Sequence, residues 1–138
     1  SLSQARRPLV KEGARFPLPH TASARFLLRD VPREAILRNI PNAHYNLPNG
    51  QRVSREQFLA DIENARHLET YSTRGIVDPH LSCIAAPLLD HEGNCVAAVS
   101  LVMPLTELDL REAELSLMLL ETAVFLTNQL KVVPFKLG

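Results

Sequence analysis

Four side chains of this sequence have the chemistry of metal ligands or of a catalytic pair: His80, Cys83, His91 and Cys95. A zinc site needs such ligands to converge tetrahedrally on one ion. The cysteines lie well along two apolar runs and His91 lies in the polar turn between them, so convergence is disfavoured. A nucleophile at Cys83, with His80 or His91 as its base, lacks a marked oxyanion hole. We therefore expect two core cysteines, no metal or other cofactor, and binding rather than enzymatic catalysis.

These cysteines belong to the stretch LSCIAAPLLDHEGNCVAAVSLVMP, residues 81–104, which predicts two buried strands joined by one tight turn. The arms Cys83–Leu89 and Cys95–Val102 are apolar and nearly free of charge, as strands in the middle of a sheet usually are. Gly93 in the turn can take the left-handed conformation that a short hairpin loop requires. With a loop at 91–93, a regular ladder would pair Cys83 with Leu101 and put Ser100 on the opposite face of the sheet.

Hydrophobic spacing and turn residues predict the elements around this hairpin. Residues 1–16 favour an edge strand. Three helices should follow: 22–29 capped by Thr21, 32–40 beginning at Pro32, and 55–69 beginning at a capping box of Ser54 and Gln57. Residues 42–52 read as a surface loop, and 70–77 as a strand with a bend at Gly75. This order predicts an α+β fold, an antiparallel sheet covered by helices.

A long helix should follow Pro104, with Thr106 or Asp109 as its cap. One apolar face is formed by Leu108, Leu115, Leu119, Leu126 and Leu130, with Thr122 among them. Further apolar residues widen that face well beyond one stripe: Leu117, Met118, Leu120, Val124 and Phe125. We therefore expect this helix to contact the sheet and also a second subunit.

The composition is that of one globular domain. The chain has 138 residues, 46% of them hydrophobic, and its 15 basic residues balance its 15 acidic ones. The hydrophobic content argues against disorder, and the charge balance makes the chain alone a poor nucleic-acid binder. No stretch reads as a signal peptide or membrane span, and two cysteines in apolar runs fit a reducing cytoplasm.

The hairpin contains many small residues, and so does the segment Ala22, Ser23 and Ala24. Their side chains leave space that bulkier ones would fill. The first turn of a helix offers free backbone N–H groups that can hold a carboxylate. Small residues serve equally well in tight packing of a helix on a sheet. The residue pattern alone leaves both interpretations open.

Two segments carry a resemblance to a known family. The run SCIAAPLLDHEGNCVAAVSLVMP resembles the signature hairpin of the effector-binding domain of IclR-type bacterial transcription regulators, and GARFPLPHTASARFLL resembles the segment that precedes it. The resemblance implies a domain similar to GAF and PAS sensors, in which an antiparallel sheet cradles a small organic acid effector. It also implies a homodimer or tetramer that contacts DNA only through a winged helix-turn-helix domain outside this chain.

The resemblance further implies which residues line the pocket. Small polar contacts would come from Cys83 and Ser100, and backbone amides near Ala24 would hold a carboxylate. The full predicted set is Ala22, Ala24, Arg25, Thr73, Asp78, Cys83, Ser100 and Val102. A β-bulge near Pro87 would shift the ladder by one residue and bring Cys83 and Ser100 to the same face.

The sequence also departs from the family pattern. Ala24 replaces the usual glycine, Pro19 stands at the common histidine position with His20 one place later, and Val102 and Met103 suggest a more apolar ligand than a two-carbon acid. The strands that normally precede residue 13 are not evident, so we expect a domain partial at its N-terminus, with an open sheet edge that a neighbouring subunit covers. These departures leave an alternative function, an oligomerisation module with a degenerate pocket.

Overall fold

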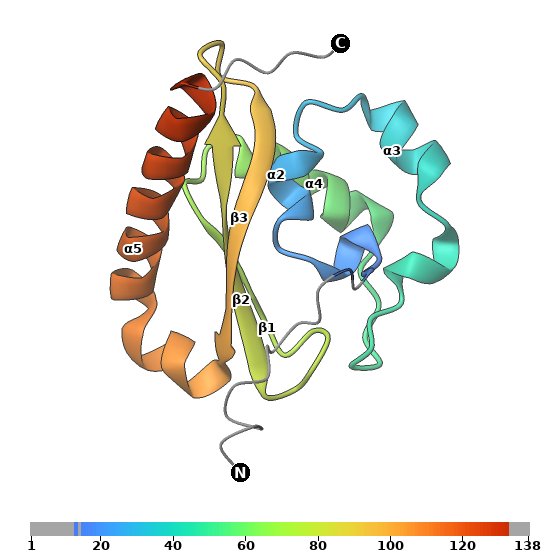
Figure 1. Ribbon diagram of the computed structural model, residues 1–138. Coiled ribbons are helices and arrows are strands. Elements are labelled where there is room, and N and C mark those ends of the chain that lie inside the picture. The colour runs from blue at the N-terminus through green and yellow to red at the C-terminus, as the bar shows by residue number, and fades with distance from the viewer. Residues whose placement is uncertain (1–12, 14, 133–138) are drawn as a thin grey trace.

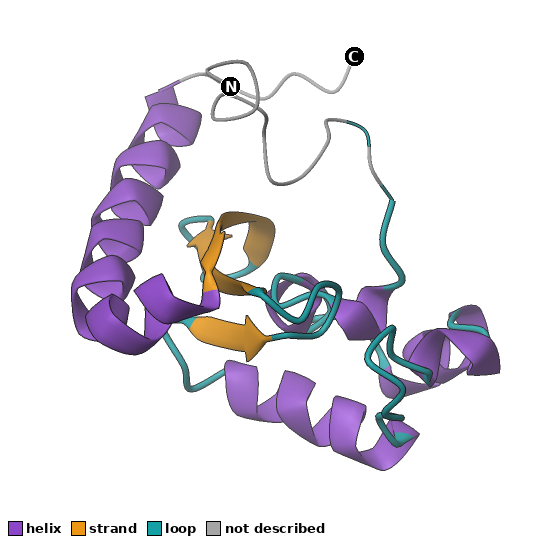
Figure 2. Cartoon of the chain, turned by 90° about the horizontal axis from the view of Figure 1, so that it is seen from below, coloured by secondary structure: helices purple, strands orange, loops and turns teal. Residues whose placement is uncertain are grey.

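The computed structural model describes residue 13 and residues 15–132. Its centre is an antiparallel sheet of β1 (Tyr71–Arg74), β2 (Leu81–Leu89) and β3 (Cys95–Pro104), in that order. Helix α5 (Leu105–Val132) covers one face of the sheet, and the shorter helices lie on the other side (Figure 1). Seen from below, the strands lie between these two groups of helices (Figure 2). The α+β prediction is confirmed.

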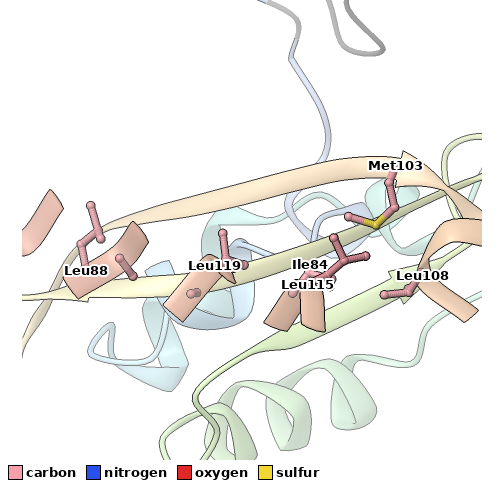
Figure 3. Packing of buried hydrophobic residues seen from close by; sticks show 8 residues of the cluster. Ile84, Leu88, Met103, Leu108, Leu115 and Leu119 are labelled. Atoms are coloured by element: carbon pink, nitrogen blue, oxygen red, sulfur yellow. The ribbon is translucent and has the colours of Figure 1, made fainter. Parts of the chain in front are cut away.

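Alternate residues of β2 serve two different cores, because successive side chains of a strand point to opposite faces. Ile84, Ala86 and Leu88 pack against α5. Figure 3 shows Leu115 and Leu119 of the helix beside this strand. On the other face, Ala85 packs against residues from α2 (Ala24–Leu27) and α4 (Arg55–Ala65), among them Phe26 and Ala65. Burial on both faces is the reason why β2 reads as a continuous apolar run.

A third core joins α2 (Ala24–Leu27), α3 (Arg33–Asn39), the 3-10 turn η2 (Asn42–Tyr45) and α4 (Arg55–Ala65). Its aromatic pair is Tyr45 and Phe58, whose ring centroids lie 5.9 Å apart in an edge-to-face arrangement. Both side chains are fully buried. Edge-to-face pairs of this kind add to the free energy gained by burial, since the ring edge is electropositive and the face electronegative.

The helix boundaries follow the predictions closely, whereas the caps follow them only in part. Ser54 precedes α4 as expected, and its Oγ accepts a hydrogen bond from the Gln57 amide at 3.0 Å. The Gln57 side chain donates instead to Asp61, so the reciprocal half of the capping box is absent. The prediction that Thr21 caps α2 is wrong, because Ser23 precedes this helix and the Thr21 hydroxyl donates to the Leu18 carbonyl.

Other local predictions need smaller corrections. Pro32 precedes the first turn of α3 rather than lying in it, and α4 ends at Ala65, leaving Leu68 43% exposed. The loop 42–52 contains η2 and an isolated bridge between Asn46 and Arg52. The predicted edge strand of residues 1–16 falls mostly on 1–12 and 14, which lie outside the described residues.

Helix α5 begins at Leu105, directly after β3, so neither Thr106 nor Asp109 is its N-cap. The helix is kinked at Arg111, whose φ of −132° and ψ of 24° are not helical. The Arg111 guanidinium bonds Glu107 before the kink and Glu114 after it. The predicted inner face is confirmed at Leu108, Leu115 and Leu119, but it does not extend to Leu130, which is 45% exposed.

Candidate ligand-binding cavity

The hairpin contains the bulge that the resemblance required. Its turn is as predicted: the Asp90 amide donates to the Asn94 carbonyl at 2.9 Å, and Gly93 has a φ of +84°. The ladder pairs Leu89 with Cys95 but Leu88 with Ala97, so Val96 is an extra residue. The shift therefore lies between Leu88 and Leu89, slightly beyond the predicted position at Pro87.

This bulge changes which residues share a face of the sheet. Cys83 pairs with Val102 instead of Leu101, and Ala85 pairs with Ser100. Because side chains alternate along a strand, Cys83, Ser100 and Val102 all lie on the face that looks toward α2. Pro87 pairs with Ala98 in the uninterrupted part of the ladder. Strand β1 pairs with β2 only as far as Ala85. Pro87, which has no N–H to donate, lies beyond this paired part and therefore interrupts no hydrogen bond between the two strands.

A cavity of about 500 Å³ opens on this face, between the segment that leads into α2, the loop after β1, and strands β2 and β3. Such a volume is typical of sites for small organic ligands. The cavity is lined by Phe16, His20, Thr21, Ala22, Ser23, Thr73, Ile76, Val77, Asp78, Leu81, Ser82, Cys83, Ser100 and Val102. Six of the eight predicted residues are among them: Ala22, Thr73, Asp78, Cys83, Ser100 and Val102.

Several polar groups of the cavity are held by hydrogen bonds. Burial raises the pKa of the Cys83 thiol above its ordinary value, and a hydrogen bond with Ser100 partly offsets this. The Asp78 carboxylate accepts from the His80 amide at 2.8 Å, which orients it at the start of the turn into β2. His20 Nε2 lies 2.9 Å from the Asn46 carbonyl oxygen, so this nitrogen carries the hydrogen and the other remains an acceptor in the neutral ring.

Two predicted residues, Ala24 and Arg25, do not line this cavity. Ala24 is completely buried and belongs to the core formed with α3 and α4. The Arg25 side chain turns to the other side of its short helix and is 5% exposed. The amides of Arg25 and Phe26 already donate to the Ala22 and Ser23 carbonyls. These two amides therefore cannot cradle a carboxylate in this conformation.

Eight residues that line the cavity were not in the predicted set: Phe16, His20, Thr21, Ser23, Leu81, Ser82, Ile76 and Val77. The last two follow Gly75, whose φ of +66° turns the chain after β1. The bend at Gly75 was predicted. The apolar pair Ile76 and Val77, directly after this bend, is the sequence feature that could have indicated a cavity wall. Phe16 was assigned to an edge strand, so its place at the cavity could not be read from the pattern.

The four side chains considered as metal ligands, His80, Cys83, His91 and Cys95, do not gather at one point. Among residue 13 and residues 15–132, no three His, Cys, Asp or Glu side chains are arranged to hold a metal ion. Both cysteines are free thiols. Within the same ranges, no helix combines the length and hydropathy needed to cross a bilayer.

The comparisons with known proteins identify the class to which this fold and cavity belong. Residues 2–127 match the family described as bacterial transcriptional regulator IclR C-terminal, and the chain belongs to this family. It is the family of effector-binding domains of these regulators. The resemblance stated from the sequence is thereby confirmed. A search of curated proteins finds no match.

Solved structures share the fold. The transcriptional regulator YaiJ superimposes with a TM-score of 0.70 at 22% identity, over 90% of this chain and 71% of that one. The repressor BlcR of Agrobacterium tumefaciens gives 0.72 at 22% identity, over 91% of this chain and 52% of the repressor. The C-terminal domain of the E. coli transcriptional regulator KdgR gives 0.61 at 22% identity, over 80% of this chain and 68% of that domain. The chain thus spans about half of the BlcR chain.

Proposed function

We propose that this domain senses a small carboxylate or aromatic acid in the cavity between α2 and the hairpin, and transmits binding to DNA through a domain outside residues 1–138. The observation that carries this proposal is the convergence of Ala22, Thr73, Asp78, Cys83, Ser100 and Val102 on one cavity. Their convergence depends on the β-bulge at Val96, without which a regular ladder would put Cys83 and Ser100 on opposite faces.

The lining favours a particular kind of acid. No lysine or arginine is among the described residues that line this cavity, so the carboxylate would be held by hydroxyl groups such as those of Ser23 and Ser100. The Asp78 carboxylate repels an anion, so the acid group of the ligand points away from it. A hydroxyl or amino group of the ligand suits the end of the cavity at Asp78. Ile76, Leu81 and Val102 form an apolar wall of the cavity, which suits an aromatic ring or a branched hydrocarbon part of the ligand.

The proposed function is tested by thermal shift and calorimetry with a panel of small organic acids. A ligand that binds only the folded chain stabilises it by about 2.7 kcal/mol at a hundred times its dissociation constant. Ser100→Phe should fill the cavity and abolish this stabilisation. Val96→Phe is the matched control, since Val96 lies on the same strand, is 55% exposed and does not line the cavity. The absence of any binder in a broad panel would contradict the proposal.

The remaining parts of the proposal concern the whole regulator. The chain acts as one sensing domain of a cytoplasmic homodimer or tetramer, without a cofactor and without catalysis. Its family membership supports this assignment. Cys83 contributes a hydrogen bond rather than a nucleophile, because burial raises its pKa and so disfavours the reactive thiolate. Substrate turnover that disappears in Cys83→Ala would overturn this part.

A second candidate function, oligomerisation through α5, rests on a specific observation. The side of this helix that faces away from the sheet carries Leu117, Val124 and Phe125, which are 59%, 61% and 61% exposed. Met118 lies beside them at 48%. These four apolar side chains surround a single charged residue, Glu121, and apolar groups of this kind on a helix mark interaction sites. This function is compatible with ligand sensing, since α5 and the cavity lie on opposite faces of the sheet.

A further inference from the structure

A groove of about 500 Å³ lies at the turn end of the hairpin and shares no lining residue with the acid-sensing cavity. One wall is the C-terminal half of α5, the opposite wall is the chain that follows α4, and the floor is the end of β2. The groove is lined by Arg29, Arg66, His67, Leu68, Glu69, Pro87, Leu89, Asp90, Leu120, Ala123, Val124, Thr127 and Asn128.

Two apolar side chains on opposite walls of this groove are open to water. Leu68, after α4, is 43% exposed, and Val124, on α5, is 61% exposed. The lining residues of α5 are spaced by three and four and therefore share one face of the helix. An apolar group placed between the walls would cover Leu68 and Val124 and gain the free energy of burying apolar surface.

The end of β2 directs backbone groups into the same groove. Residues of an antiparallel strand send both backbone groups to one neighbouring strand and then, at the next residue, to the other. The Leu81 carbonyl accepts from the Gly75 amide on the side of β1, so Pro87 and Leu89 direct their backbone groups to that side too. Strand β1 pairs only as far as Ala85, so no described strand reaches them. An extended segment would find hydrogen-bond partners there, as peptides do at sheet edges.

The rim of the groove carries two carboxylates that could hold a cation. Its two arginines already have carboxylate partners outside the groove, at 3.7 Å and 3.2 Å. Glu69 and Asp90, in contrast, form no ion pair with any described residue. The Asn94 and Glu92 amides both donate to Oδ1 of Asp90 at 2.9 Å, which lowers the pKa of this carboxyl and leaves Oδ2 for another partner.

We propose that the segment after α5, residues 133–138, folds back and docks in this groove. These residues lie outside the described ranges, and their sequence is VPFKLG. Pro134 cannot continue the helix and favours a change of direction directly after it. Phe135 then supplies the apolar group between the walls, and Lys136 supplies the cation for Glu69 or Asp90. The occupant is thus an extended apolar segment with one positive charge.

The reach of the segment fits this assignment. The C-terminal end of α5 lies at the same end of the molecule as the hairpin turn (Figure 1). From Val132, where α5 ends, Asn128 and Val124 lie about 6 Å and about 12 Å back along the helix axis. An extended chain covers about 3.3 Å per residue, so Phe135 can lie about 10 Å from Val132. It therefore reaches the part of the groove between Asn128 and Val124.

A tryptophan reporter tests the docking in the 138-residue chain. The sequence contains no tryptophan, so Phe135→Trp introduces a single fluorescent side chain. Leu110→Trp is the matched control, because Leu110 lies on α5, is 81% exposed and does not line the groove. We expect the emission of Phe135→Trp to be blue-shifted and its quenching by acrylamide to be several-fold weaker than in the control. Adding Leu68→Asp, at a half-exposed position, should remove both effects.

A charge exchange tests the role of Lys136. Lys136→Glu in the reporter chain should increase quenching, and the further change Glu69→Lys should reverse that increase. Quenching of Phe135→Trp equal to that of Leu110→Trp, or unaffected by Leu68→Asp, would overturn the proposal. Protection that disappears on dilution would place the segment on a second copy of the chain and would also overturn it. Failure to bind an organic acid leaves these results unchanged, because the two sites share no residue.

Discussion

Cys83 of β2 pairs with Val102 of β3, one residue beyond the partner that a regular ladder from the turn would provide. The shift comes from Val96, which the bulge leaves without a partner. As a result, the apolar residues Val99, Leu101 and Met103 of β3 face α5, while Ser100 and Val102 face the cavity. One extra residue therefore decides which side chains reach the core and which reach a ligand.

The bulge leads to a prediction about deletions in β3. Removing Val96 alone should straighten the ladder and leave Cys83 paired with Val102, so stability and acid binding should change little. Removing Val96 and Ala97 together should shift the ladder by one and turn Leu101 and Met103 away from α5, costing more than about 3 kcal/mol of unfolding free energy. Urea unfolding of both variants measures the difference. Equal destabilisation by the two deletions would contradict this role of the bulge.

The partly buried thiols of Cys83 and Cys95 predict a loss of stability at alkaline pH. Burial raises the pKa of Cys83 and of Cys95, so in the folded chain each thiol keeps its proton at pH values where the unfolded chain loses it. The folded state then binds more protons than the unfolded state, and the stabilisation present below the ordinary thiol pKa of about 8.5 declines as the pH rises through the raised values.

Above that pH, the urea midpoint of unfolding should therefore decline less steeply with pH in Cys83→Ala than in the unchanged chain. Cys95→Ala, at the other end of the hairpin, is the parallel variant and should remove its own share of the decline. A steeper alkaline decline in either variant would contradict the assigned direction.

The contact between β1 and α5 should be a weak contributor to stability. Arg74 Nη2 lies 2.8 Å from Glu112 and Nε lies 3.4 Å from Asp109, but the three side chains are 39%, 51% and 59% exposed. Ion pairs with this exposure are screened by water and salt. We expect Arg74→Gln to lower the unfolding free energy by about 0.2–1 kcal/mol at low salt, with a smaller effect in about 1 M salt.

Urea unfolding at both salt concentrations measures this effect, with Arg38→Gln as the control for loss of a positive charge. A larger cost that salt does not reduce would show that Arg74 also positions the strand by packing of its alkyl chain.

The exposed apolar side of α5 predicts self-association. Phe125→Glu removes the largest apolar side chain of the group formed by Leu117, Met118, Val124 and Phe125 and adds a second negative charge beside Glu121, so it should lower the oligomeric state measured by light scattering after gel filtration. Folding should be unaffected because Phe125 is 61% exposed. Thr106→Glu adds the same charge to an exposed position in the first turn of the same helix, before the kink at Arg111, and should leave the oligomer intact. A chain that is monomeric without any substitution would exclude this interface.

The local elements could be predicted because their signals are local. The hairpin turn depends on the Asp90 to Asn94 loop and Gly93, and the start of α4 depends on Ser54 beside Gln57. The inner face of α5 follows from residues spaced by three and four, which lie on one side of any helix. The two helix caps that were predicted wrongly, Thr21 and the pair Thr106 or Asp109, lie where a short 3-10 turn or the end of β3 competes for the same residues.

The cavity required more than these local signals. The resemblance brought six of its residues together in advance, but it also assigned Ala24 and Arg25 to the same wall. In the four-residue helix α2, Ala24 turns into the core with Phe58, and Arg25 turns toward Asp61 and Tyr71. Which way a single helical turn faces is decided by its neighbours in space.

By itself, the sequence determined the α+β class, the hairpin and most of the helix boundaries, since turn residues and hydrophobic spacing act over a few residues. The family was indicated by the resemblance of two segments. Only the tertiary structure decided where the ladder shifts, which cavity Thr73 and Ser100 share, and that Arg25 is buried against the Phe58 and Tyr71 rings. These features depend on contacts between segments far apart in the chain, such as Asp30 with Cys95 and Arg25 with Tyr71. These contacts form only when all the elements are packed together, so they cannot be read from any one segment of the sequence.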